Sequence, residues 1–164
     1  MSFFLTSFIH LTKRGTMEEV IKIKGGKKLS GVVNISGSKN NCVSLIPAAL
    51  LSKGLVIIHN IPPISDVYRL VDILEQCGVC ITYTDNTLII DSSNLVYKDL
   101  TMPEMGKLRA SYYFYSVFLG LFKYVKANTI GGCRLGDRPI DLHLYAFKQL
   151  GVNIIEEEGT YIFD

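Results

Sequence analysis

The sequence predicts an α/β protein that contains two copies of one helix–strand–helix–strand–strand unit. Apolar residues recur at helical spacing and at strand spacing in alternation along the chain. Two pairs of short strand patterns are each separated by the turn residues of a β-hairpin. The same order of elements returns after 73 residues, so that Gly78-Val79 aligns with Gly151-Val152. Each copy must bury its apolar face against a neighbour, and its sheet is expected to combine crossover and hairpin connections.

The first copy begins with a helical pattern that Pro47 interrupts and Gly54 follows. An apolar strand comes next, and then a helix that we expect Asp66 to cap and Gly78 to end. The turn Asp85-Asn86 predicts a closing hairpin. The predicted elements of this copy are residues 42–52, 55–59, 66–77, 79–84 and 87–91.

The second copy repeats this order, with a first helix rich in aromatic residues. We expect Asp141 to cap its second helix, Gly151 to end that helix, and Glu158-Gly159 to form the hairpin turn. The predicted elements of this copy are residues 109–122, 124–130, 142–150, 152–156 and 160–163.

The residues before the first copy follow a different pattern. An apolar stretch within residues 1–16 is followed, rather than preceded, by Lys13 and Arg14, which is the reverse of a secretory signal. We leave residues 1–16 as an unassigned extension, with Met17 as an alternative start. Two short strands, residues 20–24 and 27–35, are expected on either side of a glycine pair.

Composition excludes several classes of protein. Of 164 residues, 48% are hydrophobic and 20% charged, which rules out a mainly disordered chain. The net charge of +2 is too balanced for a general nucleic-acid or membrane-surface binder, and no apolar run is long enough for a membrane helix. Cys77 and Cys80 form a CxxC pair, but the chain has only three histidines to complete a zinc site. We therefore expect both cysteines to be small buried side chains and expect no metal.

Two loops place a cation just before a predicted helix. The loop 36–41 combines small residues with Lys39, and small residues before a helix start suit phosphate, although a plain helix cap remains an alternative. Arg109 occupies the corresponding position in the second copy. A cation at a helix N-terminus is electrostatically unfavourable without a partner. The pair therefore suggests two cations that face a shared anion, with solvated surface charges as the alternative.

A third loop, residues 130–143, carries three glycines, two arginines and Cys133 before a predicted helix. A thiol among glycines and arginines is expected to be exposed and reactive, as an attacking or proton-donating cysteine must be. His143 lies in the first turn of the helix, where an ordinary helix residue is the alternative interpretation.

These three loops resemble those of the UDP-N-acetylglucosamine 1-carboxyvinyltransferase family of enolpyruvyl transferases. The resemblance rests on residues 38–40, 108–111 and above all 131–143, and it extends over nearly everything from Met17 to Asp164. Cys133 separates this family from the sibling enzymes that act on shikimate 3-phosphate. The sequence departs from the family pattern at Arg134 and Asp137.

The resemblance implies a fold, a reaction and a location. The fold would be part of the inverted α/β barrel of the enolpyruvyl transferases. The enzyme would transfer the enolpyruvyl group of phosphoenolpyruvate to the 3′-hydroxyl of UDP-N-acetylglucosamine and release phosphate. This is the first committed step of peptidoglycan synthesis, it takes place in the cytoplasm, and it requires no cofactor and no metal.

The resemblance also implies the site residues. Cys133 would be the catalytic cysteine, which protonates or covalently captures phosphoenolpyruvate and is the target of fosfomycin. Lys39 and Arg138 would hold the phosphoenolpyruvate anion, Asn40 would touch the sugar, and Arg109 would lie by the phosphates. The residues implied around the uridine are Arg138, Pro139, Asp141 and Leu142, with His143 nearby.

Members of the family are more than twice as long as this chain and have two domains of three such repeats each. By that pattern, residues 17–36 would be strands of the other domain and residues 37–164 would be two of the three repeats of one domain. We therefore expect a complementary C-terminal half as a further partner. The alternative is a noncatalytic remnant, or one chain of a split protein, that binds UDP-sugar or a complementary half.

Overall fold

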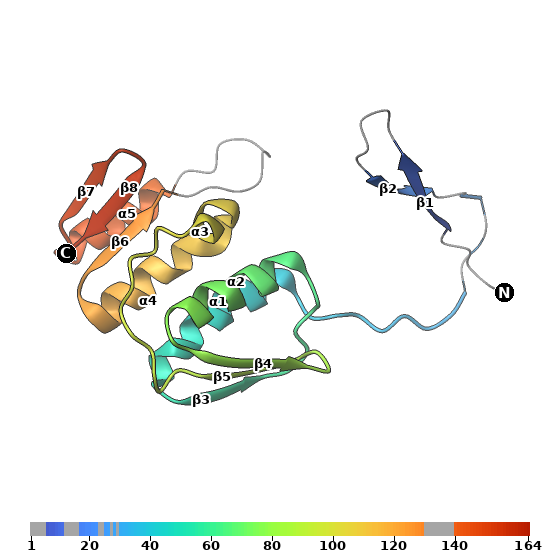
Figure 1. Cartoon of the computed structure of the whole chain (residues 1–164), viewed down its shortest axis with the longest axis horizontal. Coiled ribbons are helices and arrows are strands. Elements are labelled where there is room, and N and C mark those ends of the chain that lie inside the picture. Colours follow the sequence, from blue (N-terminus) through green and yellow to red (C-terminus); the bar gives the residue numbers. More distant parts are fainter. Residues whose placement is uncertain (1–5, 12–16, 23–24, 27, 29, 130–139) are drawn as a thin grey trace. The chain divides into compact units, whose positions relative to one another are not determined.

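The computed structural model describes the chain except for residues 1–5, 12–16, 23–24, 27, 29 and 130–139 (Figure 1). The chain divides into two compact units, Met1–Asn34 and Ile35–Asp164. In the first unit, β1 (Thr6–Leu11) pairs antiparallel with β2 (Met17–Lys22), and Phe8 lies opposite Val20. The stretch that we left unassigned therefore contributes a strand.

The strand expected at residues 27–35 is wrong for the part of it that the structure describes. Residues 28 and 30–35 form no strand, and Val32, Val33 and Ile35 are 94%, 84% and 89% exposed. A strand needs a neighbour to satisfy its backbone N–H and C=O groups. Alternating apolar residues alone do not supply that neighbour.

The second unit confirms the two predicted copies and the α/β class. The first copy consists of α1 (Lys39–Ala48), a 3₁₀ turn η1 (Ala49–Ser52), β3 (Leu55–Ile58), α2 (Ser65–Gln76), β4 (Cys80–Thr84) and β5 (Thr87–Asp91). The second copy consists of α3 (Pro103–Lys107), a 3₁₀ turn η2 (Arg109–Tyr112), α4 (Tyr113–Phe122), β6 (Val125–Asn128), α5 (Asp141–Gln149), β7 (Ile154–Glu157) and β8 (Thr160–Phe163).

Each copy folds into a three-stranded sheet with the same topology. The strand orders are β3-β5-β4 and β6-β8-β7, and every pairing is antiparallel. The hairpin turns have positive φ at both central residues, Asp85 and Asn86 in one copy and Glu158 and Gly159 in the other. Such turns match the twist of the strands that they join, which explains their Asn and Gly residues. Among the described residues the sheets do not close into a barrel.

The second helix of the first copy, α2, and the corresponding helix of the second copy, α5, each end at a glycine in the same way. Gly78 and Gly151 have φ of 84° and 90°, a conformation that other residues adopt at a cost. The following amides, of Val79 and Val152, donate to carbonyls of the last helical turn at 3.2 and 3.0 Å. Around Gly78 the packing is tight, because an added Cβ would lie 2.7 Å from a backbone oxygen; around Gly151 there is open space.

The helix caps differ from the sequence expectation. α2 begins at Ser65 and α5 at Asp141, and neither Asp66 nor Asp141 is the capping residue. Both aspartates lie in the first helical turn, where their charge still favours the helix. The Asp66 carboxylate instead pairs with two cations.

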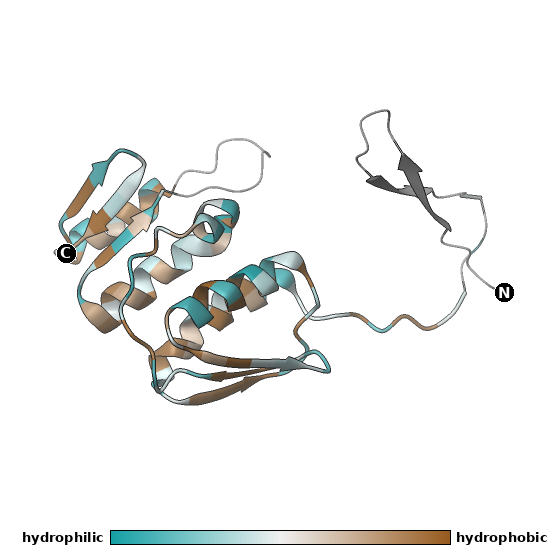
Figure 2. Ribbon diagram, viewed as in Figure 1, coloured by the Kyte–Doolittle hydropathy of each residue, from teal (hydrophilic) through white to brown (hydrophobic). Residues whose placement is uncertain are grey.

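The core lies between the helices and one face of each sheet. α1 and α2 lie over the β3–β5–β4 sheet, and α1 packs against α4, which joins the two copies (Figure 1). Apolar residues of both copies make up this core (Figure 2). Its largest fully buried side chains include Ile46, Leu70, Phe114 and Phe118.

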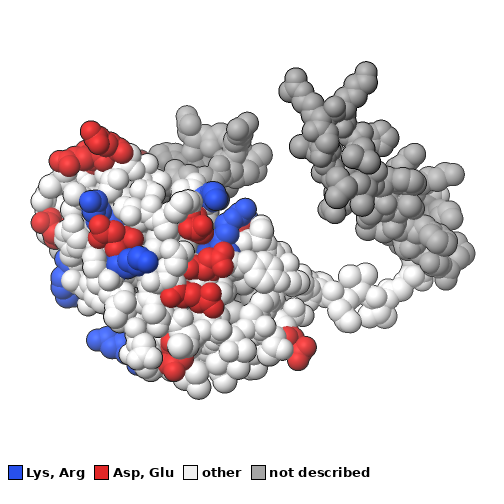
Figure 3. Space-filling model, viewed as in Figure 1, with Lys and Arg blue, Asp and Glu red and all other residues white. Residues whose placement is uncertain are grey.

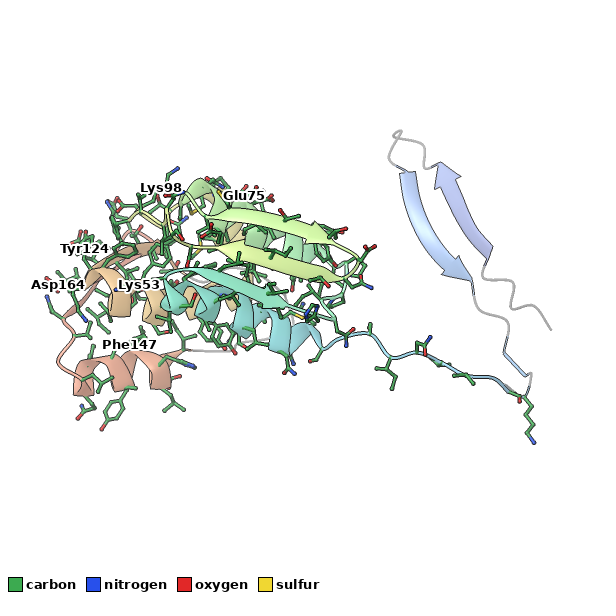
Figure 4. All side chains as sticks on the ribbon, turned by 90° about the horizontal axis from the view of Figure 1, so that it is seen from below. Lys53, Glu75, Lys98, Tyr124, Phe147 and Asp164 are labelled. Carbon is green, nitrogen blue, oxygen red and sulfur yellow. The ribbon has the colours of Figure 1, made fainter. Side chains whose placement is uncertain are left out.

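The connection between the copies, which carries Lys98 (Figure 4), is bonded to both of them. The Val96 amide donates to the Cys77 carbonyl of the first copy at 3.0 Å. The next residue, Tyr97, accepts from the amide of Lys126 in β6 at 3.2 Å through its hydroxyl. Leu100 then forms a parallel bridge with Ala127.

Candidate functional site

Lys39 and Asn40 begin α1, and both are exposed. Ser38, the residue before the helix, has an extended backbone and makes no capping hydrogen bond through its side chain. The first amides of a helix have no partner within the helix. This helix start therefore offers backbone donors and a lysine to an anionic group, as the sequence predicts for a phosphate-binding loop.

A glycine fixes the loop before α1 against the rest of the first copy. A Cβ added to Gly37 would lie 1.8 Å from the backbone oxygen of Asn60. Only a residue without a side chain permits this approach. The position of Lys39, two residues later, is therefore tied to the turn that leads into α2.

Lys39 also contacts α2 directly. Its ammonium pairs with the Asp66 carboxylate, to which Arg69 donates a hydrogen bond at 3.3 Å. The Asp66 side chain is 16% exposed and that of Lys39 is 58% exposed. Ion pairs this open contribute about 0–1 kcal/mol to stability, so the pair matters more for where it holds the ammonium. Sequence reasoning gave Asp66 only a capping role.

Arg109 opens η2 and is half-buried, immediately before α4. Its positive charge acts on the Tyr112 phenol and lowers the pKa of that group, while burial, the larger effect, raises it to about 12. Tyr112 is therefore neutral near pH 7 and lies within electrostatic reach of the cation.

The first turn of α5 carries Asp141, Leu142 and His143, all of them exposed. The His143 ring lies 4.9 Å from the Tyr112 ring, with an angle of 59° between the two planes. Two residues expected in the site, Arg109 and His143, thus both act on one tyrosine that we did not predict: the imidazole contacts its ring, and the charge of Arg109 acts on its phenol. The available signal was the aromatic pattern that follows Arg109, which we used only to predict a helix.

A cavity of about 250 Å³ lies beside this tyrosine, between α4 and α5. Its walls are mainly aromatic, with a serine hydroxyl and the His143 imidazole as polar groups. Phe147, which lies on α5 (Figure 4), is one of the residues that line it. The full lining is Tyr112, Tyr113, Tyr115, Ser116, Ile140, His143, Ala146 and Phe147.

Part of the predicted site lies outside the described residues. Cys133, Arg138 and Pro139 belong to residues 130–139. The structure places Lys39 and Asn40 at the start of α1, and places Arg109 and His143 around Tyr112. α1 packs against α4, so both groups belong to one packed helix layer.

The remaining cysteines differ from one another. Cys42 and Cys77 are buried, and burial raises the pKa of the Cys77 thiol to about 11. Cys80 is exposed on the edge strand β4, which corrects our expectation that both cysteines of the CxxC pair are buried. In the part of the chain that the structure describes, no three His, Cys, Asp or Glu side chains gather as metal ligands would.

The described surface carries charges of both signs (Figure 3). Acidic and basic side chains are interspersed on the face shown in Figure 3. Among the described helices, none has the length and apolar character needed to cross a membrane.

Comparisons with known proteins identify relatives along most of the chain. Residues 23–163 match the family described as EPSP synthase (3-phosphoshikimate 1-carboxyvinyltransferase). UDP-N-acetylglucosamine 1-carboxyvinyltransferase 2 of Listeria monocytogenes is 45% identical over 144 residues, which are 88% of this chain and 34% of that protein. The Streptococcus pyogenes protein of the same name is 47% identical over 143 residues, which are 86% and 33% of the two chains.

The fold comparison agrees with these relatives. The crystal structure of the enolpyruvyl transferase NikO from Streptomyces tendae matches with a TM-score of 0.70 and 24% identity. The match covers 85% of this chain and 31% of that one. The chain thus spans about a third of the length of the curated relatives that it matches.

Proposed function

The chain belongs to the EPSP synthase family of enolpyruvyl transferases, and on this premise we propose that it contributes to the reaction of a UDP-N-acetylglucosamine 1-carboxyvinyltransferase. The enolpyruvyl group of phosphoenolpyruvate is transferred to the 3′-hydroxyl of the sugar nucleotide, and phosphate leaves. The observation that carries the proposal is the 45% identity over 88% of the chain to a protein of that name. The setting is cytoplasmic peptidoglycan synthesis.

The reaction is an addition followed by an elimination. The sugar hydroxyl gives up its proton as its oxygen bonds to C2 of phosphoenolpyruvate, and C3 takes up a proton; in the second step C3 loses a proton and the bond from C2 to the phosphate oxygen breaks, which releases phosphate. Cys133 is the residue proposed to protonate or to capture phosphoenolpyruvate. Its neighbours Gly132 and Arg134 support that role, because a thiolate requires access and nearby positive charge.

The cations have a clear electrostatic task in this proposal. Phosphoenolpyruvate and a nucleoside diphosphate sugar are both polyanions, and their mutual repulsion must be offset where they meet. Lys39 and Arg138 are assigned to phosphoenolpyruvate, Asn40 to the sugar, and Arg109 to the diphosphate. Charge-assisted hydrogen bonds to phosphate favour arginine in these roles. The uridine would contact Arg138, Pro139, Asp141 and Leu142, near His143.

In the domain scheme of the proposal, residues 37–164 are two repeats of one family domain. Residues 17–36, which include β2, then belong to the other domain. The proposed partner is a complementary C-terminal half, since family members of full length contain both domains.

A binding experiment tests the substrate assignment. The 164-residue chain is titrated with UDP-N-acetylglucosamine and, separately, with shikimate 3-phosphate, and side-chain resonances of the three histidines are followed by NMR. The proposal expects the sugar nucleotide, but not shikimate 3-phosphate, to shift the His143 resonances. A response to shikimate 3-phosphate alone would assign the chain to the other branch of the family.

An activity experiment tests the reaction. The chain is mixed with the unmatched C-terminal two thirds of the Listeria relative, and phosphate release from phosphoenolpyruvate is measured with and without UDP-N-acetylglucosamine. Release that depends on the sugar nucleotide, and that Cys133→Ala removes, is expected. Release that persists without the sugar nucleotide would contradict the proposed transfer.

A further inference from the structure

Tyr112 occupies a central position between two residues that the proposed function uses. It is the last residue of η2, directly before α4, and its half-buried ring contacts the Tyr113 ring at a centroid distance of 4.3 Å. On its other side it contacts the exposed His143 ring at 4.9 Å. Aromatic rings at such tilted geometries attract each other beyond the area that they bury.

The contact is important for His143 because Leu144 and Phe147 anchor α5 to the core, whereas the first turn of the helix, which carries His143, is exposed. None of the described side chains of α5 is fully buried. Leu142 and Tyr145 are 75% and 62% exposed on the same helix. An imidazole in the first turn of so exposed a helix has little to fix its rotamer, other than the ring against which it packs.

Arg109 brings a cation to the same place. It lies three residues before Tyr112 within the same 3₁₀ turn, and its charge acts on the Tyr112 phenol. The Tyr112 ring thus packs on an imidazole and lies within the electrostatic field of a guanidinium, so that both groups lie near one tyrosine. Two such donors, fixed relative to each other, suit a group with several anionic oxygens.

We propose that Tyr112 is a positioning residue, whose ring orients the His143 imidazole so that His143 and Arg109 bind the diphosphate of the sugar nucleotide together. This inference rests on the proposed function. The Tyr112 ring, and not its hydroxyl, orients His143, because the two side chains contact each other through their rings.

Three variants separate the ring, the hydroxyl and the helix surface. Tyr112→Met removes the ring but keeps much of its volume, and Tyr112→Phe removes the hydroxyl alone. Tyr145→Met is the matched control, because Tyr145 is an exposed tyrosine on α5 that does not line the cavity. Each variant of the 164-residue chain is examined by NMR of its histidine side chains, with His143→Asn to assign the resonances.

Tyr112→Met is expected to move the His143 ring resonances and to leave those of His59 in place. It is also expected to weaken the binding of UDP-N-acetylglucosamine about three- to tenfold, which is the range for loss of one aromatic contact. Tyr112→Phe and Tyr145→Met should both stay within about twofold of the original affinity. In the His143→Asn background, Tyr112→Met should add no further loss, because the two residues act as one unit.

Two results would overturn the inference. One is a Tyr112→Met chain that keeps both the His143 resonances and the affinity. The other is a Tyr112→Phe chain that binds as weakly as Tyr112→Met, since the hydroxyl would then contact the ligand itself. If Tyr112→Met lowers the stability of the chain, the comparison in the His143→Asn background still tests the inference. A further loss of affinity in that background would contradict it. Failure of the proposed function looks different: the sugar nucleotide then shifts no histidine resonance of the unmodified chain, whereas the Tyr112→Met comparison without ligand still reports the ring contact.

Discussion

Replacement of Gly37 by alanine tests whether the loop before α1 is fixed by close backbone contact. The added Cβ would lie 1.8 Å from the Asn60 oxygen, and contacts of real Cβ atoms are essentially never below 3.0 Å. The two backbone segments must therefore separate by more than an ångström. Because Lys39 follows two residues later, its ammonium would leave its position beside Asp66.

The expected stability cost follows from two opposing effects. Forcing extra volume into a close contact costs about 1–3 kcal/mol. Replacing glycine by alanine stabilises the folded state by about 0.4–1 kcal/mol, because the unfolded chain loses freedom. Gly54→Ala isolates the second effect, since an added Cβ at Gly54 meets nothing within 4 Å. We expect the two variants to differ by about 2 kcal/mol, or roughly 5 °C in Tm for a chain of this size.

Thermal unfolding followed by circular dichroism measures this difference, and titration with phosphoenolpyruvate measures the functional consequence. Displacement of a ligand group by about an ångström can cost up to ~10²-fold, so Gly37→Ala should bind at least tenfold more weakly than Gly54→Ala. Equal Tm values and equal affinities for the two variants would refute the close contact and its role in placing Lys39.

Three further predictions follow from the helix ends, the thiols and the exposed apolar residues. Gly151→Ala should cost about 1 kcal/mol in urea unfolding, and Gly78→Ala clearly more, because only Gly78 adds a clash to its positive φ; equal costs would contradict this. A limiting alkylating agent, with peptides read by mass spectrometry, should label Cys133 first, Cys80 next and Cys77 last. Labelling of Cys77 should keep rising with pH up to about 11, because burial raises the pKa of its thiol and only the thiolate reacts. The chain should self-associate in light scattering, because many large apolar side chains are exposed; a monodisperse monomer without binding of apolar dyes would argue against it.

Local sequence signals predicted the parts of the fold that are decided locally. The hairpin turns and the helix ends at Gly78 and Gly151 were correct because positive φ restricts the residue type at a single position, whereas at the end of the first helix Lys53, and not Gly54, has the positive φ. The strand expected at residues 27–35 failed because pairing depends on a distant partner. Cys80 was misjudged because exposure on β4 depends on its place at the edge of the sheet.

In the candidate site, too, features decided by the local sequence could be predicted and features that depend on distant contacts could not. Lys39 at a helix start could be predicted from the small residues before it. The pairing of Asp66 with Lys39 could not, because it joins two helices across the loop that Gly37 and Asn60 hold together. Tyr112 was not singled out from the sequence, because a helical apolar pattern does not distinguish a buried ring from one that packs beside a site.

The connection between the two copies has a mechanical consequence. The Val96 amide is bonded to the first copy, and the Tyr97 hydroxyl and the Leu100 amide are bonded to the second, so only a few residues of the connection separate the two attachments. A connection this short limits how far one copy can move or unfold while its neighbour stays intact. Strain that opens either sheet is passed directly to the other, and the pair should respond to load or to a proteolytic cut as a single cooperative body.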